Sequence, residues 1–470
     1  MTRSLRDRLV DALRGRPSPV LITDEGAIPA ASLWIGSRLW VRAFRAAGLR
    51  PGDRVILALP PSAAFVEVLV AALWEGLSIA PVPPGADTLA LLDQLDAVVA
   101  VVPAPPGAAE SLPPGTWGAD GCSGPHLPLA AVRRAASAPT PDAVLLMCSS
   151  GTTGSPHWVA LSDRNICSVL DSHQPRLSLT DAYVVSVLPW HHAFGLILDL
   201  LPALLDGAYI VRDPFGGRDA ESLARLLRQA PAALSAVPAT IASLAALPDG
   251  PTLISGLTGG IIGGASVGPD LAELLTGSAL RVGYGQTEAS PGISLGDPGR
   301  WQPNLLGRAL GCEVRVVDGG LEFRGPNACL GSWDAGGLRM LDPRRWVATH
   351  DGVDLVDGEL FYRGRLADRF KLDNGRWVDT TALEPLLRAA LPSASDVLLF
   401  TTDGSTMDVL VLAPPGTASD AVATEATVRT ILGPMSARLG CLHWRTPPEV
   451  VRTPKGAIDR AETVRALLAR

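Results

Sequence analysis

Residues 143–155, AVLLMCSSGTTGS, join an apolar run to a loop of glycine, serine and threonine. The apolar run predicts a buried strand, because it is short and turn-forming residues follow it directly. In such a loop, successive backbone N–H groups can form an anion-binding nest, and the hydroxyls add donors. It is not a Walker loop, because no Gly-Lys-Ser/Thr follows. A Ser/Gly linker is the alternative, but the position after a buried strand favours a phosphate cradle.

Candidate strands and helices alternate on both sides of this stretch. Residues 30–50 have helical periodicity that ends at Gly48, and residues 63–75 predict a second helix. Further strands are predicted at RVILALP (54–60), SIAPVPP (78–84), YVVSVLP (183–189), AYIVRD (208–213), AALSAVP (232–238) and TLISGL (252–257). This alternation is typical of an α/β fold with a parallel sheet. Residues 101–140, rich in Pro, Gly, Ala and Ser, predict a surface connection.

The pattern changes after about Ala289. The segments CEVRVVDGGLEFRG (312–325) and GELFYRGR (358–365) predict antiparallel hairpins with Asp-Gly turns. From Leu366 onward, ALEPLLRAAL predicts a helix, DVLLF and DVLVLA predict strands, and a last helix follows. We therefore expect a large α/β region of several subdomains over residues 1–365, with parallel sheets and a small β-rich part. A small α+β domain is expected over residues 366–470.

Composition excludes several classes of protein. The 470 residues are 47% hydrophobic with a net charge of −7, which excludes a disordered chain and argues against nucleic-acid binding. At roughly 150 residues per domain, this length suggests about three domains. The longest uncharged stretch, residues 229–248, is interrupted by Pro231 and Pro238, so no membrane span is expected. The cysteines are too scattered for a disulfide framework or a zinc site, which favours a soluble cytoplasmic enzyme. They are Cys122, Cys148, Cys167, Cys312, Cys329 and Cys441.

Three further motifs could bind ligands. In Tyr284-Gly285-Gln286-Thr287-Glu288, the tyrosine can stack on a purine, the threonine can donate to a phosphate and the glutamate can ligate Mg²⁺. The small residues Gly263, Gly264 and Ala265 would let a ligand approach the backbone, although a tight turn is the simpler interpretation. His191 and His192 lack nearby partners for a metal site, so they favour a pocket wall or a core position.

Residues 264–268, GASVG, also match the GxSxG nucleophile elbow, with His350 and His443 downstream. In a chain with 48 glycines such a match is common, so a serine hydrolase is a minor alternative.

Taken in order, these segments resemble the adenylate-forming acyl-CoA synthetases and adenylation domains. The matching segments are SSGTTG (149–154), PWHHAFG (189–195), Gly-Gly-Ala, Tyr-Gly-Gln-Thr-Glu, WVATHD (346–351), Gly364-Arg365 and RTPKGAIDR (452–460). The resemblance runs almost from end to end. It implies a large N-terminal AMP-binding domain and a mobile C-terminal domain. It also implies joining of a carboxylic acid to the α-phosphate of ATP, followed by transfer of the acyl group to a thiol.

The resemblance also implies roles for individual residues. Ser149, Ser150, Gly151, Thr152, Thr153 and Gly154 would hold the pyrophosphate end of ATP. Gly263, Gly264, Ala265, Tyr284 and Gly285 would frame the adenine, and Asp351 and Arg365 would hold the ribose. Thr287 would meet the α-phosphate, Glu288 would ligate Mg²⁺, and His192 would line the acyl site.

The chain departs from the family at its C-terminal lysine loop. The position of the adenylation lysine is Ala457, and the nearest cation is Lys455, to which we assign the catalytic role. In an extended segment these two residues face the same side, roughly 6.5–7 Å apart, a distance that a lysine stem can span. We therefore predict an ATP-dependent acid–thiol ligase for an aryl or fatty acid. The thiol would be coenzyme A (CoA) or the phosphopantetheine of an acyl or peptidyl carrier protein. The alternative is an adenylation-deficient homologue, either an acyltransferase between CoA and a carrier protein or an acyl-binding pseudoenzyme.

Overall fold

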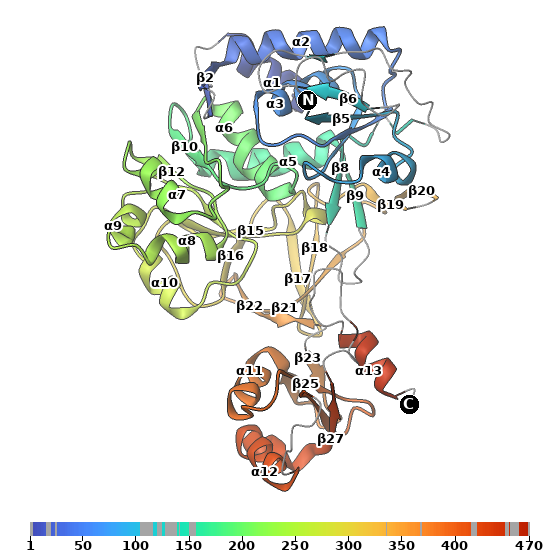
Figure 1. Ribbon diagram of the computed structural model, residues 1–470, viewed down its shortest axis with the longest axis vertical. Helices are drawn as coiled ribbons and strands as arrows, with labels where there is room; N and C mark the ends of the chain where they lie inside the picture. The colour runs from blue at the N-terminus through green and yellow to red at the C-terminus, as the bar shows by residue number, and fades with distance from the viewer. Residues whose placement is uncertain are drawn as a thin grey trace.

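The structure is a computed structural model that describes most of the chain. The described residues are 3–15, 20–23, 26–103, 116–119, 125–126, 139–140, 142–149, 157–334, 336–366, 369–414, 421–446, 451 and 460–468. They form a larger part with three sheets and a smaller C-terminal part, which lie at opposite ends of the molecule (Figure 1).

Nine of the described strands form the first sheet, in the order β20-β19-β9-β8-β4-β3-β5-β6-β7. They are β3 (Arg54–Leu57), β4 (Ser78–Pro81), β5 (Val99–Pro103), β6 (Thr116–Ala119), β7 (Pro125–His126), β8 (Leu145–Ser149), β9 (His157–Leu161), β19 (Gly331–Asp334) and β20 (Gly337–Met340). The pairs from β8 through β4, β3 and β5 to β6 are parallel, as predicted. Strands β3 and β4 are buried along their whole length, which explains why every residue after Arg54 in β3 and after Ser78 in β4 is apolar. The predicted surface connection at 101–140 is wrong in part, because β6 and β7 extend this sheet.

The second sheet has the order β12-β10-β11-β1-β2. Its strands are β1 (Val20–Thr23), β2 (Gly26–Pro29), β10 (Tyr183–Ser186), β11 (Tyr209–Arg212) and β12 (Ala232–Ala233). The strand predicted at 252–257 is wrong, because the first four residues of this run lie in the helix α9 (Gly250–Ser255). Pro251 lies in the first turn of α9, where its missing N–H breaks no helical hydrogen bond. A short apolar run cannot distinguish a strand from a buried helix.

The third sheet has the order β13-β14-β15-β16-β22-β21-β18-β17 and carries most of the candidate site. Its strands are β13 (Ile261–Ile262), β14 (Arg281–Tyr284), β15 (Ser294–Leu295), β16 (Leu305–Ala309), β17 (Glu313–Val317), β18 (Gly320–Arg324), β21 (Val347–Val356) and β22 (Glu359–Arg365). Both Asp-Gly turns are confirmed. Asp318 and Gly319 have φ of 50° and 75°, and Asp357 and Gly358 have φ of 50° and 79°, as a type I′ turn requires.

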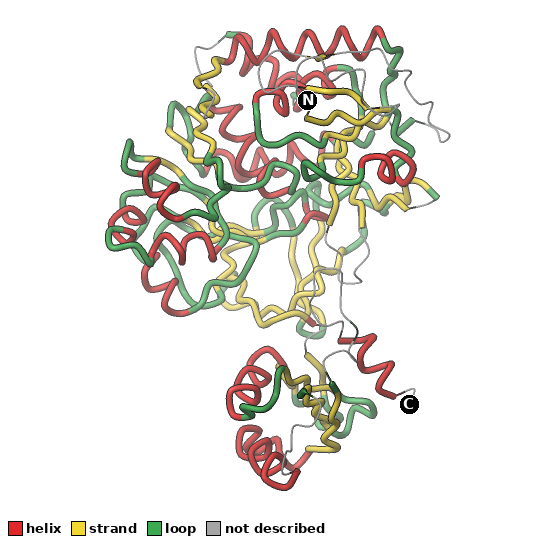
Figure 2. Tube along the Cα trace, viewed as in Figure 1, coloured by secondary structure: helices red, strands yellow, loops and turns green. Residues whose placement is uncertain are grey.

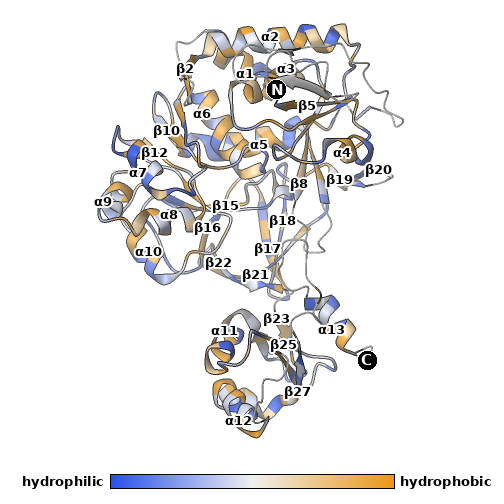
Figure 3. Cartoon of the chain, in the orientation of Figure 1, coloured by the Kyte–Doolittle hydropathy of each residue, from blue (hydrophilic) through white to orange (hydrophobic). Residues whose placement is uncertain are grey.

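Helices cover the sheets of the larger part (Figure 2). They are α1 (Leu5–Arg14), α2 (Ala30–Ala46), α3 (Ala63–Trp74), α4 (Thr88–Gln94), α5 (Asp163–His173), α6 (Leu201–Asp206), α7 (Ala220–Leu227), α8 (Pro238–Ala245), α9 and α10 (Pro269–Leu275). Short turns of other kinds are the 3₁₀ helices η2 (Gln174–Arg176) and η4 (Thr287–Ala289) and the π-helix η3 (Phe194–Leu200). Helix α2 carries both hydrophobic and hydrophilic residues (Figure 3) and buries Leu33, Trp40 and Phe44. None of the described helices is long and apolar enough to cross a membrane.

The smaller part has its own sheets and core. Its elements are β23 (Arg369–Lys371), β24 (Trp377–Asp379), α11 (Thr380–Ala390), β25 (Asp396–Phe400), β26 (Met407–Leu412), α12 (Ala421–Leu432), η6 (Gly433–Arg438), β27 (Leu439–Arg445) and α13 (Arg460–Leu468). Residues of β25 and β26 alternate between a core shared with α11 and α12 and a second one packed by α13. The boundary predicted at residues 365 and 366 falls between β22 and β23, and the mobility of this part stays a prediction.

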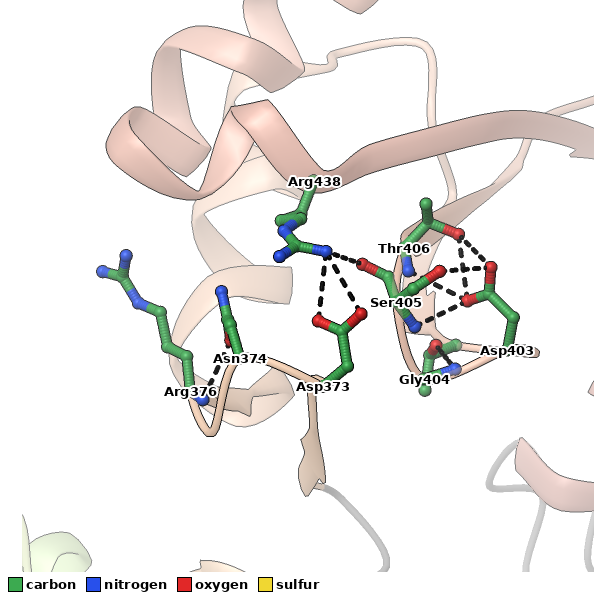
Figure 4. Close-up of polar contacts among 9 residues, drawn as sticks. Asp373, Asn374, Arg376, Asp403, Gly404, Ser405, Thr406 and Arg438 are labelled. Carbon is green, nitrogen blue, oxygen red and sulfur yellow. Dashed lines mark hydrogen bonds and ion pairs between the residues drawn. The ribbon is translucent and has the colours of Figure 1, made fainter.

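Two turns of the smaller part are joined by one arginine (Figure 4). Arg438 Nη1 lies 3.1 Å from Asp373 Oδ1 and donates to the Ser405 carbonyl at 3.2 Å. Asp403 accepts hydrogen bonds from the backbone N–H groups of Ser405 and Thr406. The turns that follow β23 and β25 are therefore held together.

Candidate active site

The stretch that opened the sequence analysis is framed by two paired strands. Strand β8 ends at Ser149, β9 begins at His157, and these two residues face each other in an antiparallel pair. Half-buried Ser149 is thus the last described residue before the predicted phosphate loop. Ser150, Gly151, Thr152, Thr153 and Gly154 lie outside the described residues, as do Lys455 and Ala457.

The predicted purine and ribose residues meet on the third sheet. The Tyr284 hydroxyl, at the end of β14, donates to Asp351 Oδ2 at 2.6 Å. Arg365 Nε lies 3.1 Å from Asp351 Oδ1. Its N–H does not point at that oxygen, so Oδ1 has no hydrogen bond from any described residue although Asp351 is only 4% exposed. This orphaned acceptor fits a ligand that brings a hydroxyl donor.

A shift in strand pairing brings Arg365 opposite Asp351. Near the turn, β21 and β22 pair Val356 with Glu359, but the register moves by one residue between Asp351 and Val353. Gly364 lies at this irregularity with φ of 95°, a conformation that favours glycine. Without the shift, Gly364 would face Asp351 and the carboxylate would lose its cationic neighbour.

Burial sets the ionisation of this cluster. It raises the pKa of Asp351, and the hydrogen bond from Tyr284 and the Arg365 charge oppose that increase. Burial and the Asp351 charge raise the pKa of Tyr284, so its hydroxyl keeps its proton and remains a donor. The pair thus holds one carboxylate oxygen in place and leaves the other for a ligand.

His350, just before Asp351, has φ of 61°. Glycine is favoured in this left-handed conformation, and the resembling family has Thr-Gly-Asp where this chain has Thr-His-Asp. His350 therefore adopts a conformation that suits glycine, the residue found here in the resembling family.

An apolar pocket of about 390 Å³ opens beside Tyr284. Its wall is formed by His173, Phe194, Leu198, Ile261, Gly263, Gly264, Gly283, Tyr284, Gly285, Pro291, Ser294 and Leu295. A Cβ on Gly263 would lie 2.7 Å from the Gly283 carbonyl oxygen, and Gly264 has φ of 84°, so both positions require glycine. Ala265 is exposed and does not line the pocket. The sequence motifs predicted the pocket glycines and Tyr284. They did not predict His173, Phe194 and Leu198, because these residues lie in helices whose apolar spacing is also typical of an ordinary core.

Thr287 and Glu288 lie in η4, which packs against β9 next to the phosphate loop. The turn ends at Ser290 with φ of 56°, and the backbone N–H of Cys329 donates to the Glu288 carbonyl. Burial and the Glu288 carboxylate raise the pKa of Cys329 to about 12. The Glu288 carboxylate is a ligand type that Mg²⁺ prefers, and its predicted role at the phosphates stays a prediction.

His192 is exposed and does not line the described pocket. Its ring lies 4.5 Å from that of His191, and burial lowers the pKa of His191 to about 4. The pair precedes Phe194 and Leu198 of η3, which do reach the pocket. π-Helices occur often at functional sites, so the segment is near the site although His192 faces outward.

A serine hydrolase and a metal-binding site, the two other chemistries considered, find no support in the described residues. Ser266 makes no hydrogen bond to a described histidine, and His443 lies in β27 beside Asp408. Asp408, Cys441 and His443 have ligand atoms within 4.8 Å of one another. Asp408 already accepts from the Cys441 backbone N–H and contacts His443 Nε2 at 3.2 Å, so the geometry is explained by strand pairing. The five described cysteines are free.

Comparison with known proteins decides the family. Residues 37–329 match the family described as AMP-binding enzyme, which is more than half of the chain. The chain belongs to this family.

Two relatives of known activity agree with this assignment. The anthranilate–CoA ligase of Pseudomonas aeruginosa is 27% identical over 404 residues, 75% of this chain and 74% of that protein. A feruloyl-CoA synthase from an Amycolatopsis species is 30% identical over 367 residues, 70% of each chain. The crystal structure of the anthranilate CoA ligase AuaEII with anthranoyl-AMP has a TM-score of 0.70 at 19% identity and covers 99% of this chain and 98% of that one. The predicted family, α/β fold class and AMP-forming ligase class are confirmed.

Proposed function

We propose that this AMP-binding enzyme activates an aryl carboxylic acid with ATP and passes the acyl group to CoA. The pocket beside Tyr284 carries the proposal, because it is apolar, compact and adjacent to the Asp351 acceptor. Its wall is largely apolar, with few polar side chains, which suits the ring of an aryl acid. The relatives named for anthranilate and feruloyl substrates also favour an aryl acid.

In this proposal the chain's residues hold ATP for attack by the acid. Asp351 Oδ1 accepts a ribose hydroxyl, and Tyr284 both orients that carboxylate and presents its ring to the adenine. Gly263 and Gly264 let the purine approach the backbone. Thr287 donates to the α-phosphate, and Ser149 with the loop behind it holds the pyrophosphate end. Arg365 balances the charge of Asp351. Phe194 and Leu198 of η3, which follow His192 in the chain, form part of the wall around the acid.

Glu288 would hold Mg²⁺, which would neutralise phosphate charge. We expect Glu288→Gln to remove most adenylate formation and to raise the Mg²⁺ concentration needed for half-maximal rate, because one charged ligand is lost. Pyrophosphate release against Mg²⁺ concentration measures both effects. Glu273→Gln, at an exposed position in α10, is the matched control and should keep the wild-type curve. A wild-type Mg²⁺ dependence in Glu288→Gln would contradict this role.

Coenzyme A is the simplest thiol acceptor, and a carrier-protein phosphopantetheine is the alternative. A cytoplasmic location also stays a prediction. Pyrophosphate release with ATP and a panel of aryl and fatty acids, followed by CoA thioester formation, tests the proposed function directly. An enzyme that releases no pyrophosphate with any acid, yet moves an acyl group from CoA to a carrier protein, would instead be the acyltransferase that Ala457 leaves open.

A further inference from the structure

His173, the last residue of α5, lines the pocket, and one of its two ring nitrogens has no hydrogen-bond partner among the described residues. His173 is 1% exposed and lines the pocket, and its Nε2 has no hydrogen-bond partner among the described residues. A buried polar atom without a partner is rare and requires an explanation. Because His173 also lines a cavity, a ligand in that cavity can supply the partner.

The other ring nitrogen determines what kind of partner is needed. His173 Nδ1 lies 2.9 Å from Ser172 Oγ. The Ser172 hydroxyl has one proton and two backbone carbonyl acceptors, Ser168 at 2.9 Å and Val169 at 3.1 Å. Because two carbonyls are within reach of this one proton, we assign it to a carbonyl and the remaining proton of the contact to Nδ1, which donates to Ser172 Oγ. Nε2 then carries a lone pair and requires a donor.

The ring is held at the pocket by its packing and stays neutral. A Cβ on Gly292 would lie 2.6 Å from His173 Cε1 and 2.8 Å from Nε2, so only glycine leaves this edge of the imidazole uncovered. Burial lowers the pKa of His173 to about 4, so the ring is neutral at physiological pH.

The rest of the pocket wall offers no competing acceptor of this kind. Besides His173, the described wall has two polar side chains, Tyr284 and Ser294. Tyr284 donates to Asp351, and Ser294 donates to the Leu306 carbonyl. The remaining wall residues are apolar or glycine. The Tyr284 and Ser294 oxygens can still accept, but each already has a hydrogen-bond partner, whereas His173 Nε2 has none among the described residues. Such an unpaired acceptor discriminates strongly, because a substrate without the matching donor leaves it unpaired.

We propose that His173 Nε2 accepts a hydrogen bond from a hydroxyl or amino group on the ring of the aryl acid, and so selects hydroxy- or amino-substituted benzoates. This inference rests on the proposed function, since it assigns the pocket to the acid. His173 touches the substrate but takes no part in the chemical step.

The test compares ring substituents that differ in their donor. Pyrophosphate release is measured with benzoate and with the ortho, meta and para isomers of hydroxy-, amino- and methylbenzoate. At one ring position, we expect kcat/KM for the hydroxy or amino acid to exceed that for the methyl acid by about 10- to 100-fold. His173→Phe should reduce this ratio to about one. The ratio is taken within each variant, so any change in kcat/KM for benzoate, which has no ring donor, is measured separately. His173→Gln, which restores an acceptor, should recover part of the ratio.

Two outcomes would overturn the inference. One is a wild-type enzyme that prefers the methyl acid, or shows no preference, at all three ring positions. The other is a folded His173→Phe variant that keeps the wild-type ratio. Calorimetric binding of the same free acids without ATP separates this inference from the proposed function. If no acid releases pyrophosphate, the proposed function fails, and the binding preferences still decide the role of His173.

Discussion

At the scale of single residues, the proposed ribose-binding role of Asp351 gives a direct prediction. Asp351→Asn should weaken ATP binding by about 1.5–3 kcal/mol, because a charged acceptor for the ribose is lost. Calorimetric titration with ATP measures the change. Asp354→Asn is a suitable control, since Asp354 lies on the same strand and forms an exposed ion pair with Arg363. Equal ATP affinity in Asp351→Asn and wild type would refute the assignment.

The neighbouring His350 permits a prediction about stability. Its φ of 61° is strained for a residue with a Cβ, by roughly 1 kcal/mol, whereas glycine adopts it freely. We expect His350→Gly to unfold at the same or a slightly higher urea concentration than wild type. His350→Val should unfold earlier, because a β-branched residue fits this conformation worst. If the valine variant were more stable than the glycine variant, backbone strain at position 350 would not determine the stability of these variants.

At the scale of elements, the π-helix η3 carries a buried acid with a pH-dependent effect on stability. Asp199 is 2% exposed, and burial raises its pKa to about 7, although the Ser186 hydroxyl donates to it at 2.7 Å. Between about pH 4 and pH 7 the unfolded chain loses this proton and the folded chain keeps it. The free energy of unfolding should therefore fall as pH rises through this range, by about 1.4 kcal/mol per unit. Asp199→Asn should lack that component, and chemical denaturation of both proteins across the range measures it. Parallel stability profiles would contradict the raised pKa.

The elements also show which sequence patterns determine structure. Asp318-Gly319 and Asp357-Gly358 predicted their hairpins, because few residues tolerate two consecutive positive φ angles. The run at 252–257 predicted a strand, but its first four residues lie in α9, since so short a run does not specify a period. For the site, ordered glycine, tyrosine and aspartate motifs located Tyr284 and Asp351. His173 could not be found in this way, because its unpaired nitrogen results from packing between α5 and the segment at Gly292.

At the scale of the whole molecule, we predict that a cation from the C-terminal part takes part in adenylation at the site in the larger part. Losing such a preorganised cation costs about 100- to 1000-fold in rate. If Lys455 supplies it, Lys455→Ala should reduce pyrophosphate release by that factor and spare thiol transfer from a preformed acyl-adenylate. Adding Ala457→Lys to that variant should restore release, because it puts the cation at the family position. Single-turnover assays of the two half-reactions separate these effects. Unchanged pyrophosphate release in Lys455→Ala would rule out this lysine.

The pairing shift at Gly364 makes strand length a determinant of substrate affinity. Asp351 and Arg365 face each other only because the count of residues from the Asp357-Gly358 turn differs by one between the two strands. A one-residue insertion at this exposed turn touches no ligand, yet it would move every side chain of β22 to the opposite face of the sheet. Libraries that vary loop lengths in this enzyme should therefore leave this hairpin intact. A homologous loop grafted at this turn must have the same number of residues as the loop it replaces. Its sequence matters less.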